Sequence, residues 1–300
     1  MTTTPIDTRP EILAYGPVHL NVVSRDRSLR FWRDIVGLRL RSGDAELVEL
    51  GTAKETILVL HPGATGPVRR GHRGLYHVAI YVPGDAEFAR LASRLIARRA
   101  RFGATDHVMA RSLYLNDPDG IGLELALQTP ERFGRVRITD DGIEVFDARG
   151  QLRSGNDPFD VRELLSTPRD PDLDSPLAAG TTMGHLHLSV ADLDAAIAFY
   201  RDAMGFTLQN YWPHMGMADF HAGYGPLHRL AINVWNGPGA PPAPPGGAGL
   251  RDATFHYDSI ARLRAALSRL PDAEQTDRGY RVRDADGNTI LLTGPAAGEG

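Results

Sequence analysis

The chain contains no cysteine. Disulfides, thiolate nucleophiles and thiolate metal ligands are therefore excluded, and any metal ion must be held by nitrogen and oxygen atoms. The 11 histidines of the chain supply ample nitrogen for such a site, although most of them are expected on the surface or in the core.

Long apolar runs and basic tracts are also lacking. No apolar stretch approaches the roughly 20 residues that a membrane-spanning helix needs, and the N-terminal MTTTPIDTRP has no hydrophobic signal core. The net charge is −4, and basic residues are not interleaved with aromatic ones, which argues against a nucleic acid partner. These absences predict a cytoplasmic protein that binds neither membranes nor nucleic acids.

What the chain has instead is an internal repeat. The segment GPVHLNVVSRDRSLRFWRDIVGL at 16–38 resembles MGHLHLSVADLDAAIAFYRDAMGF at 183–206, and a shift of 168 positions (187 minus 19) aligns His19 with His187. The turn sequences DPDG and DADG recur at nearly the same offset. The repeat predicts two domains joined by a connector and flanked by an arm and a tail: 1–14 arm, 15–128 first domain, 129–181 connector, 182–294 second domain and 295–300 tail.

Each repeat mixes the patterns of strands and helices. Alternating apolar residues predict strands, and apolar stripes at helical spacing predict helices. In the first repeat the expected strands are 15–24, 46–50, 56–61, 74–82, 111–115 and 121–127, and the expected helices are 26–35 and 85–99. In the second repeat the expected helices are 192–204 and about 258–269, and the last strand is 288–293. The first repeat thus contains a unit of strand, helix and several strands twice.

The two repeats agree on scaffold residues but differ at one carboxylate. After DPDG the chain reads IGLE and ends on Glu124, whereas after DADG it reads NTIL and ends on Leu291. Glu124, His77, His187 and His19 each lie on an alternating strand, on the face opposite its aliphatic residues. Singly, such residues are more often solvated or structural. Together, two neutral imidazoles and one carboxylate form the facial triad that binds Fe(II) or a similar ion and leaves coordination positions open.

The unit of one strand, one helix and three strands, used four times in two pairs, resembles the vicinal oxygen chelate superfamily. That superfamily includes glyoxalase I, extradiol ring-cleaving dioxygenases, fosfomycin-modifying enzymes and bleomycin-binding proteins. The likeness covers almost the whole chain and is greatest to two-domain bacterial catechol 2,3-dioxygenase-like proteins. It is carried by GLYHVAIYVP at 74–83, DHVMARSLYLNDPDGIGLEL at 106–125, GHLHLSV at 184–190 and the strand Asn233-Val234-Trp235. The resemblance implies an α+β fold: a tandem repeat of paired βαβββ modules, four modules in two domains.

The resemblance also implies a set of metal ligands. His77 and Glu124 match the ligands of one module, and the third ligand is a histidine on the first strand of the partner module. His187 is the preferred candidate, and His19 is the alternative if the modules pair within each repeat. His185 shares a face with His187 and is expected to be structural or to support a ligand. The expected metal is Fe(II), with Mn, Zn or Ni as alternatives.

Further roles follow from the same resemblance. Tyr114 matches a tyrosine that hydrogen-bonds substrate oxygen in extradiol enzymes, although a strand tyrosine in the core is an equal alternative. His107 and Asp106 match a position at the entrance of the site. His228 matches the distal histidine that serves as acid–base and stabilises bound oxygen. His61 is its equivalent in the first repeat, where a surface position is the simpler interpretation.

Three functions are compatible with these features. The leading hypothesis is an Fe(II)-dependent extradiol dioxygenase that opens a catechol-type aromatic diol with O2. The second is an oxygen-independent, metal-dependent lyase or isomerase of the glyoxalase type, which needs a second carboxylate that Leu291 does not supply. The third is a small-molecule-binding protein of the resistance type, against which the retained histidines and Glu124 argue. Both a monomer and a homo-oligomer are compatible with the sequence.

Overall fold

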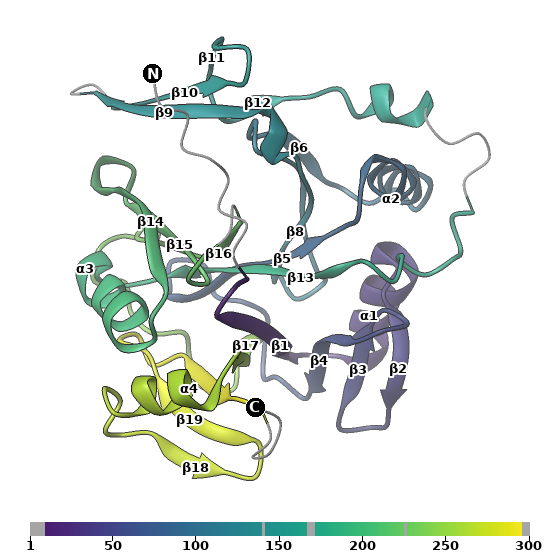
Figure 1. Ribbon diagram of the computed structural model, residues 1–300. Coiled ribbons are helices and arrows are strands. Elements are labelled where there is room, and N and C mark those ends of the chain that lie inside the picture. Colours follow the sequence, from purple (N-terminus) through teal and green to yellow (C-terminus); the bar gives the residue numbers. More distant parts are fainter. Residues whose placement is uncertain (1–9, 140–141, 167–171, 225–226, 296–300) are drawn as a thin grey trace.

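The structure is a computed structural model, and it describes residues 10–139, 142–166, 172–224 and 227–295. Most of the expected arm and tail lies outside the described residues. Four units of similar order build the two repeats (Figure 1). The first unit is β1 (Leu13–Val22), α1 (Arg25–Leu29), η1 (Arg30–Val36), β2 (Arg39–Gly43), β3 (Val48–Gly51) and β4 (Thr56–Pro62). The second is β5 (Gly74–Tyr81), α2 (Asp85–Ala97), β6 (Gly103–Asp106), β7 (Ala110–Asn116) and β8 (Gly122–Gln128).

The second repeat contains the other two units. The third unit is β13 (Thr182–Ser189), α3 (Leu193–Ile197), η4 (Ala198–Ala203), β14 (Thr207–Trp212), η5 (Pro213–Met215), β15 (Met217–His221) and β16 (His228–Asn233). The fourth is β17 (Gly249–Tyr257), α4 (Ile260–Leu267), β18 (Glu274–Thr276), β19 (Gly279–Arg283) and β20 (Thr289–Thr293). The expected strands and helices are all present within a few residues, and the α+β class is confirmed, but the sequence analysis did not predict strands such as β2, β6, β14 and β15.

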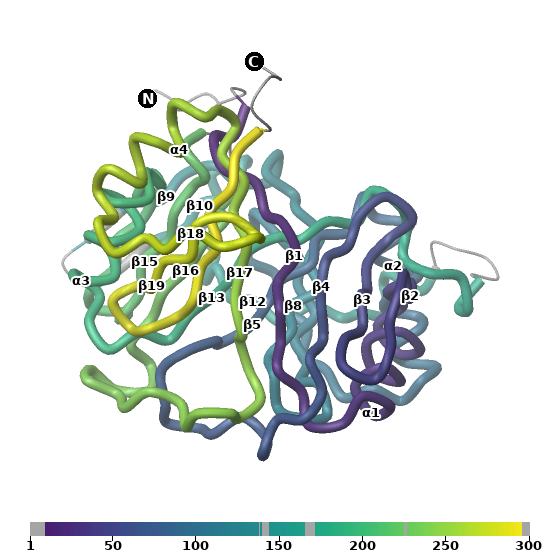
Figure 2. The backbone as a smooth tube through the Cα atoms, turned by 90° about the horizontal axis from the view of Figure 1, so that it is seen from below, coloured from purple at the N-terminus to yellow at the C-terminus, as the bar shows by residue number. Residues whose placement is uncertain are grey.

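The large sheets combine units from different repeats. One sheet has nine strands in the order β12-β6-β7-β8-β5-β13-β16-β15-β14, and the other has eight in the order β18-β19-β20-β17-β1-β4-β3-β2. The second unit thus joins the third through the antiparallel pair β5–β13, and the first joins the fourth through β1–β17. Figure 2 shows β1 and β17 side by side at the centre of the molecule. The repeat boundaries of the sequence, 15–128 and 182–294, do not coincide with the sheets.

The alternation of the first strand explains how the core forms. Val18, Leu20 and Val22 are fully buried on one face of β1, so that the residues between them face the opposite side of the sheet. The helix predicted for 26–35 begins after Ser24, whose hydroxyl accepts a hydrogen bond from the N–H of Arg27. It continues as a π-helix and ends at Gly37, in the left-handed conformation at φ 100°. The equivalent helix of the second repeat also changes from α to π, at η4.

The connector between the repeats is folded rather than a plain surface strap. Residues 129–181 contain η2 (Pro130–Arg132), β9 (Phe133–Thr139), β10 (Gly142–Asp147), β11 (Leu152–Arg153), β12 (Asp157–Pro158) and η3 (Val161–Ser166). Strands β9, β10 and β11 form a small sheet of their own, and β12 pairs with β6 at the edge of the nine-stranded sheet. In Figure 1 the small sheet runs along the top of the molecule, beginning above β12 and β6.

The far end of the connector is bound by helix α2. The Arg94 side chain on this helix is only 1 % exposed, and its guanidinium donates hydrogen bonds to the carbonyls of Val36, Leu173 and Ser175. These bonds satisfy the buried guanidinium and fix the connector against the first unit. No helix among the described residues combines the length and apolar character that crossing a membrane requires.

Candidate metal centre

One face of the nine-stranded sheet carries a row of side chains across three strands. The parallel pairing of β5 and β8 sets Ala79 beside Glu124, and the antiparallel pairing of β5 and β13 sets Ala79 beside His185. Ala79 is fully buried and small, so it leaves space between the two larger side chains. His77 projects from the same strand as Ala79, two residues earlier, and on the same face.

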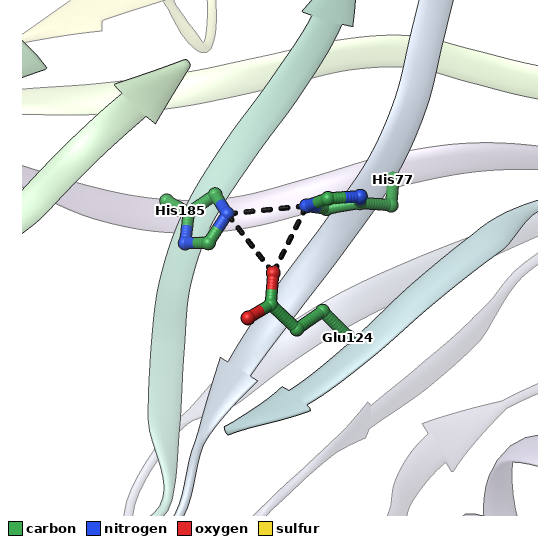
Figure 3. A group of neighbouring side chains, drawn as sticks. All are labelled: His77, Glu124 and His185. Carbon is green, nitrogen blue, oxygen red and sulfur yellow. Dashed lines mark hydrogen bonds and ion pairs between the residues drawn. The ribbon is translucent and has the colours of Figure 1, made fainter. Parts of the chain in front are cut away.

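These side chains converge on one point (Figure 3). Oε2 of Glu124 lies 3.1 Å from Nε2 of His77 and 3.3 Å from Nε2 of His185. The two imidazole nitrogens are 3.2 Å apart. All three residues are buried, and their ligand atoms lie within 4.8 Å of one another. Two imidazoles and a carboxylate from three adjacent strands therefore form a compact cluster.

The histidine that completes this cluster is His185, whereas the sequence analysis preferred His187. The two share a strand face, so alternation alone cannot separate them. The register of the strands separates the two histidines. His187 pairs with His77 and lies in the row of Gly122, whereas His185 lies in the row of Glu124. Nε2 of His187 instead accepts a hydrogen bond from the Asn233 amide, at 2.8 Å. His187 thus supports the cluster from beside His77, with ring centroids 4.8 Å apart.

The alternative ligand, His19, lies in the other sheet. Its Nδ1 and Nε2 contact His61 at 2.8 Å and Arg278 at 2.7 Å, and Asp252 binds the same arginine. Burial lowers the pKa of His19 to about 4, and the Arg278 charge adds to this effect. By their register in the eight-stranded sheet, His19 and His61 are equivalents of His187 and Asn233. The expected equivalence of His61 with His228 is therefore wrong. They take no part in the cluster around Glu124.

The charges of the cluster suit metal binding. Burial by itself would raise the pKa of Glu124, but the close contacts of its carboxylate with the His185 and His77 rings outweigh burial and hold this pKa well below its ordinary value. Burial lowers the pKa values of His185 and His187. The cluster therefore offers an anionic carboxylate and neutral imidazole nitrogen, the protonation states in which these groups bind metals.

Neighbouring hydroxyls orient the ligand atoms. The Ser112 hydroxyl donates to Oε1 of Glu124 at 2.6 Å, which leaves Oε2 facing the histidines. The Tyr81 hydroxyl lies 2.9 Å from Nδ1 of His185 and 3.2 Å from the carbonyl of His228. A carbonyl only accepts, so the Tyr81 proton points to it and the hydroxyl oxygen accepts from Nδ1–H of His185. The lone pair on Nε2 of His185 then faces the cluster, as a metal requires.

The sequence analysis gave Ser112 no role. Tyr81 was given no role either. Its position two residues beyond Ala79, on the strand face of His77, was the available signal, because metal-bound histidines usually have a partner for their second ring nitrogen. Ser112 pairs across the ladder with Ala126, two residues from Glu124, and its alternation on the strand could have indicated the same face.

The other residues expected at the site lie around the cluster. The His228 ring centroid is 4.2 Å from that of His185, and the Tyr114 ring centroid is 5.8 Å from that of His77. Tyr114 lies directly opposite Glu124 in the β7–β8 ladder, and its hydroxyl is 2.9 Å from Nε2 of His107. Burial and, after it, the Glu124 charge raise the pKa of Tyr114. His228, Tyr114 and His107 are thus all brought to the cluster.

Exposed aromatic side chains form a wall beside the cluster. The β5–β13 ladder has an irregularity between His187 and Leu188 that leaves Tyr76 as an extra residue of β5, and such bulges redirect side chains. The Tyr76 ring lies 4.9 Å from the His187 ring and 5.3 Å from that of Trp235. Tyr76 and Trp235 are 43 % and 47 % exposed. An aromatic surface therefore borders the buried ligands on the solvent side.

The residues present fit a divalent first-row metal ion. Oε2 of Glu124 and Nε2 of His185 are directed to a common point with Nε2 of His77, and two imidazoles with one carboxylate are the ligand set of non-haem Fe(II) sites with open positions. A buried carboxylate against two imidazoles is costly unless a positive charge compensates it. The cluster is therefore arranged to bind a metal ion.

Comparisons with known proteins identify relatives of this chain. A family model described as the glyoxalase/bleomycin resistance protein/dioxygenase superfamily matches residues 14–125, and one described as bleomycin resistance protein-like N-terminal matches residues 182–223. A catechol-2,3-dioxygenase of Bacillus subtilis (strain 168) is 31 % identical over 282 residues, which cover 90 % of this chain and 93 % of that protein.

The chain belongs to the glyoxalase/bleomycin resistance/dioxygenase superfamily. Solved structures agree on the fold of this superfamily. A putative dioxygenase from Bacillus subtilis subsp. subtilis str. 168 superposes with a TM-score of 0.62 at 11 % identity, covering 97 % of this chain and 87 % of its own. The E144Q mutant of glyoxalase I from Zea mays gives 0.57 at 15 % identity, covering 95 % and 94 %. The superfamily membership predicted from the sequence is thereby confirmed.

Proposed function

We propose that this protein is an Fe(II)-dependent extradiol dioxygenase that opens a catechol-type aromatic diol with O2. The observation that carries the proposal is the cluster of two histidines and one glutamate at the centre of the nine-stranded sheet. The similarity to a catechol-2,3-dioxygenase along nearly the whole chain supports it. His77, Glu124 and His185 are the proposed ligands.

A metal ion held by His77, Glu124 and His185 would supply the Lewis acidity that makes a diol easier to deprotonate and the redox chemistry that O2 requires. Glu124 contributes the anionic ligand, and Ser112 and Tyr81 keep Glu124 and His185 oriented. The protein side chains around the cluster do the rest of the work: they bind the substrate, exclude water and move protons.

His228 is the proposed acid–base group. Burial lowers its pKa well below the ordinary value, so its imidazole is neutral at pH 7 and can accept a proton from a substrate hydroxyl. Its ring stands against that of His185, at the edge of the cluster where a substrate bound there would lie. Tyr114, opposite Glu124, is the proposed hydrogen-bonding partner of a substrate oxygen.

The aromatic wall fits the ring of such a substrate. Tyr76 and Trp235 present exposed aromatic faces and edges beside the ligands, and offset or edge-on stacking on an aromatic ring contributes roughly 1 kcal/mol beyond burial. A planar diol held at the cluster would extend towards these two residues.

The main rival is an oxygen-independent lyase or isomerase of the glyoxalase type, and the similarity to a glyoxalase I structure keeps it as the comparison in the experiment. Apoprotein is loaded anaerobically and separately with Fe(II), Mn(II), Zn(II) and Ni(II). Each form is assayed for O2 uptake with catechol and for turnover of the hemithioacetal of methylglyoxal and glutathione without O2. The proposal expects O2 uptake with Fe(II) or Mn(II) and no hemithioacetal turnover. Hemithioacetal turnover by the Zn(II) or Ni(II) form, without O2 uptake by any form, would contradict it.

A further inference from the structure

The turn that carries His107 is strained. Val108 has φ 70° although its side chain is β-branched and fully buried, and such residues rarely adopt this conformation unless their surroundings hold them there. Two side chains do so. The Asp106 carboxylate accepts a hydrogen bond from the Val108 N–H at 2.8 Å, and the Thr129 hydroxyl donates to the Val108 carbonyl at 2.9 Å.

The connector holds this turn from outside. Arg132 donates to Oδ2 of Asp106 at 2.6 Å, and Arg153 lies 3.9 Å from the same oxygen and 3.0 Å from Asp157. Asp157 also pairs with Asp106 in the β12–β6 ladder. Asp106 is therefore shared between the strained turn and two arginines of the connector, and the connector segment 153–157 is docked on the turn.

The docked segment contacts His107 directly. Nδ1 of His107 lies 2.8 Å from the carbonyl oxygen of Gly155. Gly155 has φ 74°, and a Cβ atom there would come within 3.2 Å of the Val145 side chain. This carbonyl is therefore placed by a backbone conformation that favours glycine.

The two contacts of His107 fix the direction of the hydrogen bond between His107 and Tyr114. A carbonyl oxygen only accepts, so Nδ1 of His107 carries a proton. In the neutral imidazole Nε2 is then an acceptor, and the Tyr114 hydroxyl at 2.9 Å is the donor. The Glu124 carboxylate, opposite Tyr114 in the ladder, is the competing acceptor for the Tyr114 proton, and the His107 contact turns this proton towards Nε2 of His107 instead.

We propose that the connector segment 153–157 is a positioning element of the site, which holds His107 in the Nδ1–H tautomer and so makes Tyr114 a hydrogen-bond acceptor towards the substrate. With its own proton given to His107, the Tyr114 oxygen can accept a hydrogen bond from a substrate hydroxyl. Without the Gly155 carbonyl, His107 is free to take the Nε2–H form, which donates to Tyr114 and makes Tyr114 a donor. The effect on turnover rests on the proposed function, whereas the tautomer does not.

The first test reads the tautomer without any turnover. The full chain, labelled with ¹⁵N at histidine and loaded with diamagnetic Zn(II), is studied by long-range ¹H–¹⁵N correlation at pH 8, with a His107→Gln variant to assign the signals. The proposal expects Nδ1 of His107 to show the shift of a protonated nitrogen and Nε2 that of an unprotonated one. A protonated Nε2, alone or with a protonated Nδ1, would overturn it.

The second test disfavours the left-handed backbone conformation of residue 155 and leaves the other residues of the connector unchanged. Gly155→Ala is compared with Gly150→Ala, a matched control because Gly150 lies in the same connector with φ 77° and a Cβ there meets nothing within 4 Å. We expect Gly155→Ala to mix the two His107 tautomers and to lower kcat by about fivefold, the scale of one neutral hydrogen bond, with metal content unchanged. Gly150→Ala should change neither.

The outcomes separate this proposal from the proposed function. Equal tautomer ratios in the two alanine variants and the native chain would refute the positioning role, whatever the activity. A different result would support the positioning role and contradict the dioxygenase: the native chain shows the Nδ1–H tautomer, Gly155→Ala loses it, and the native chain takes up no O2 with any diol.

Discussion

Asp219 should make the free energy of unfolding of this protein fall as the pH rises. It lies on β15 of the nine-stranded sheet, in the row of Ala231 and His187. The side chain is buried, and its two oxygens accept hydrogen bonds from the Asn210 amide at 2.8 and 3.1 Å. Burial raises the pKa of Asp219 to about 7, and the Asn210 hydrogen bond opposes this only in part.

The magnitude follows from linkage between protonation and folding. The ordinary pKa of 3.8 applies to the unfolded chain and about 7 to the folded one, so between these values the folded state retains a proton that the unfolded state has lost. Stability therefore falls as pH rises through this window, and the loss is complete above pH 7. The difference between the two pKa values lowers the free energy of unfolding by at most about 4 kcal/mol at pH 8 and about 2 kcal/mol at pH 5.

Asp219→Asn removes the ionisation and keeps an acceptor for Asn210. Urea unfolding in the presence of a chelator should show the variant to be more stable than the native chain, by up to about 4 kcal/mol at pH 8 and about half of that at pH 5. Asp272→Asn, at an exposed aspartate, is the control and should change little at either pH. A stability difference for Asp219→Asn that is the same at both pH values would refute the reasoning.

Other predictions concern the cluster and the connector. Glu124→Gln should remain folded but bind metal at least roughly 100-fold more weakly, because the anionic ligand is gone; full metal occupancy by elemental analysis would remove Glu124 from the ligand set. His185→Ala should likewise lose the metal, whereas His187→Ala and His19→Ala should retain it, and the reverse pattern would restore the sequence-based choice. Arg94→Met removes the donor to the buried Val36 carbonyl and to the half-buried Leu173 carbonyl, and one of two donors to the Ser175 carbonyl. It should lower the free energy of unfolding by about 2 kcal/mol; an unchanged urea midpoint would show that the connector is held elsewhere.

Much of the fold could be predicted from the sequence. Strand alternation and helical stripes depend on local burial, so the strands at 74–82 and 121–127 and the helix at 85–99 agree with β5, β8 and α2 within a few residues. The pairing of units between repeats could not be predicted, because the first strand of each unit has an edge that can pair with the first strand of either partner unit. The connector strands are two to seven residues long. The alternation of Val136 with two arginines in β9 and the Ile-Glu-Val pattern in β10 were signals that the sequence analysis did not use.

The candidate site was predictable to the level of strand faces. His77 and Glu124 were identified because each lies on the strand face opposite the aliphatic residues and matches a ligand position of the family that the chain resembles, and the structure brings them together. His185 and His187 share one face, and only the register with Ala79 separates them. The contact of His107 with Gly155 joins residues 48 positions apart across a connector, and no local pattern in the sequence indicates it.

The most direct test of the central claim is the fate of labelled oxygen. Native protein and Glu124→Gln are loaded with Fe(II) anaerobically and then given catechol and ¹⁸O₂, and the products are analysed by mass spectrometry. An extradiol dioxygenase should yield a yellow ring-opened semialdehyde that contains oxygen from O2, formed by the native protein and not by Glu124→Gln. Unchanged catechol from a native protein with full iron occupancy, or equal product from both proteins, would contradict the assignment of this cluster as a dioxygenase centre.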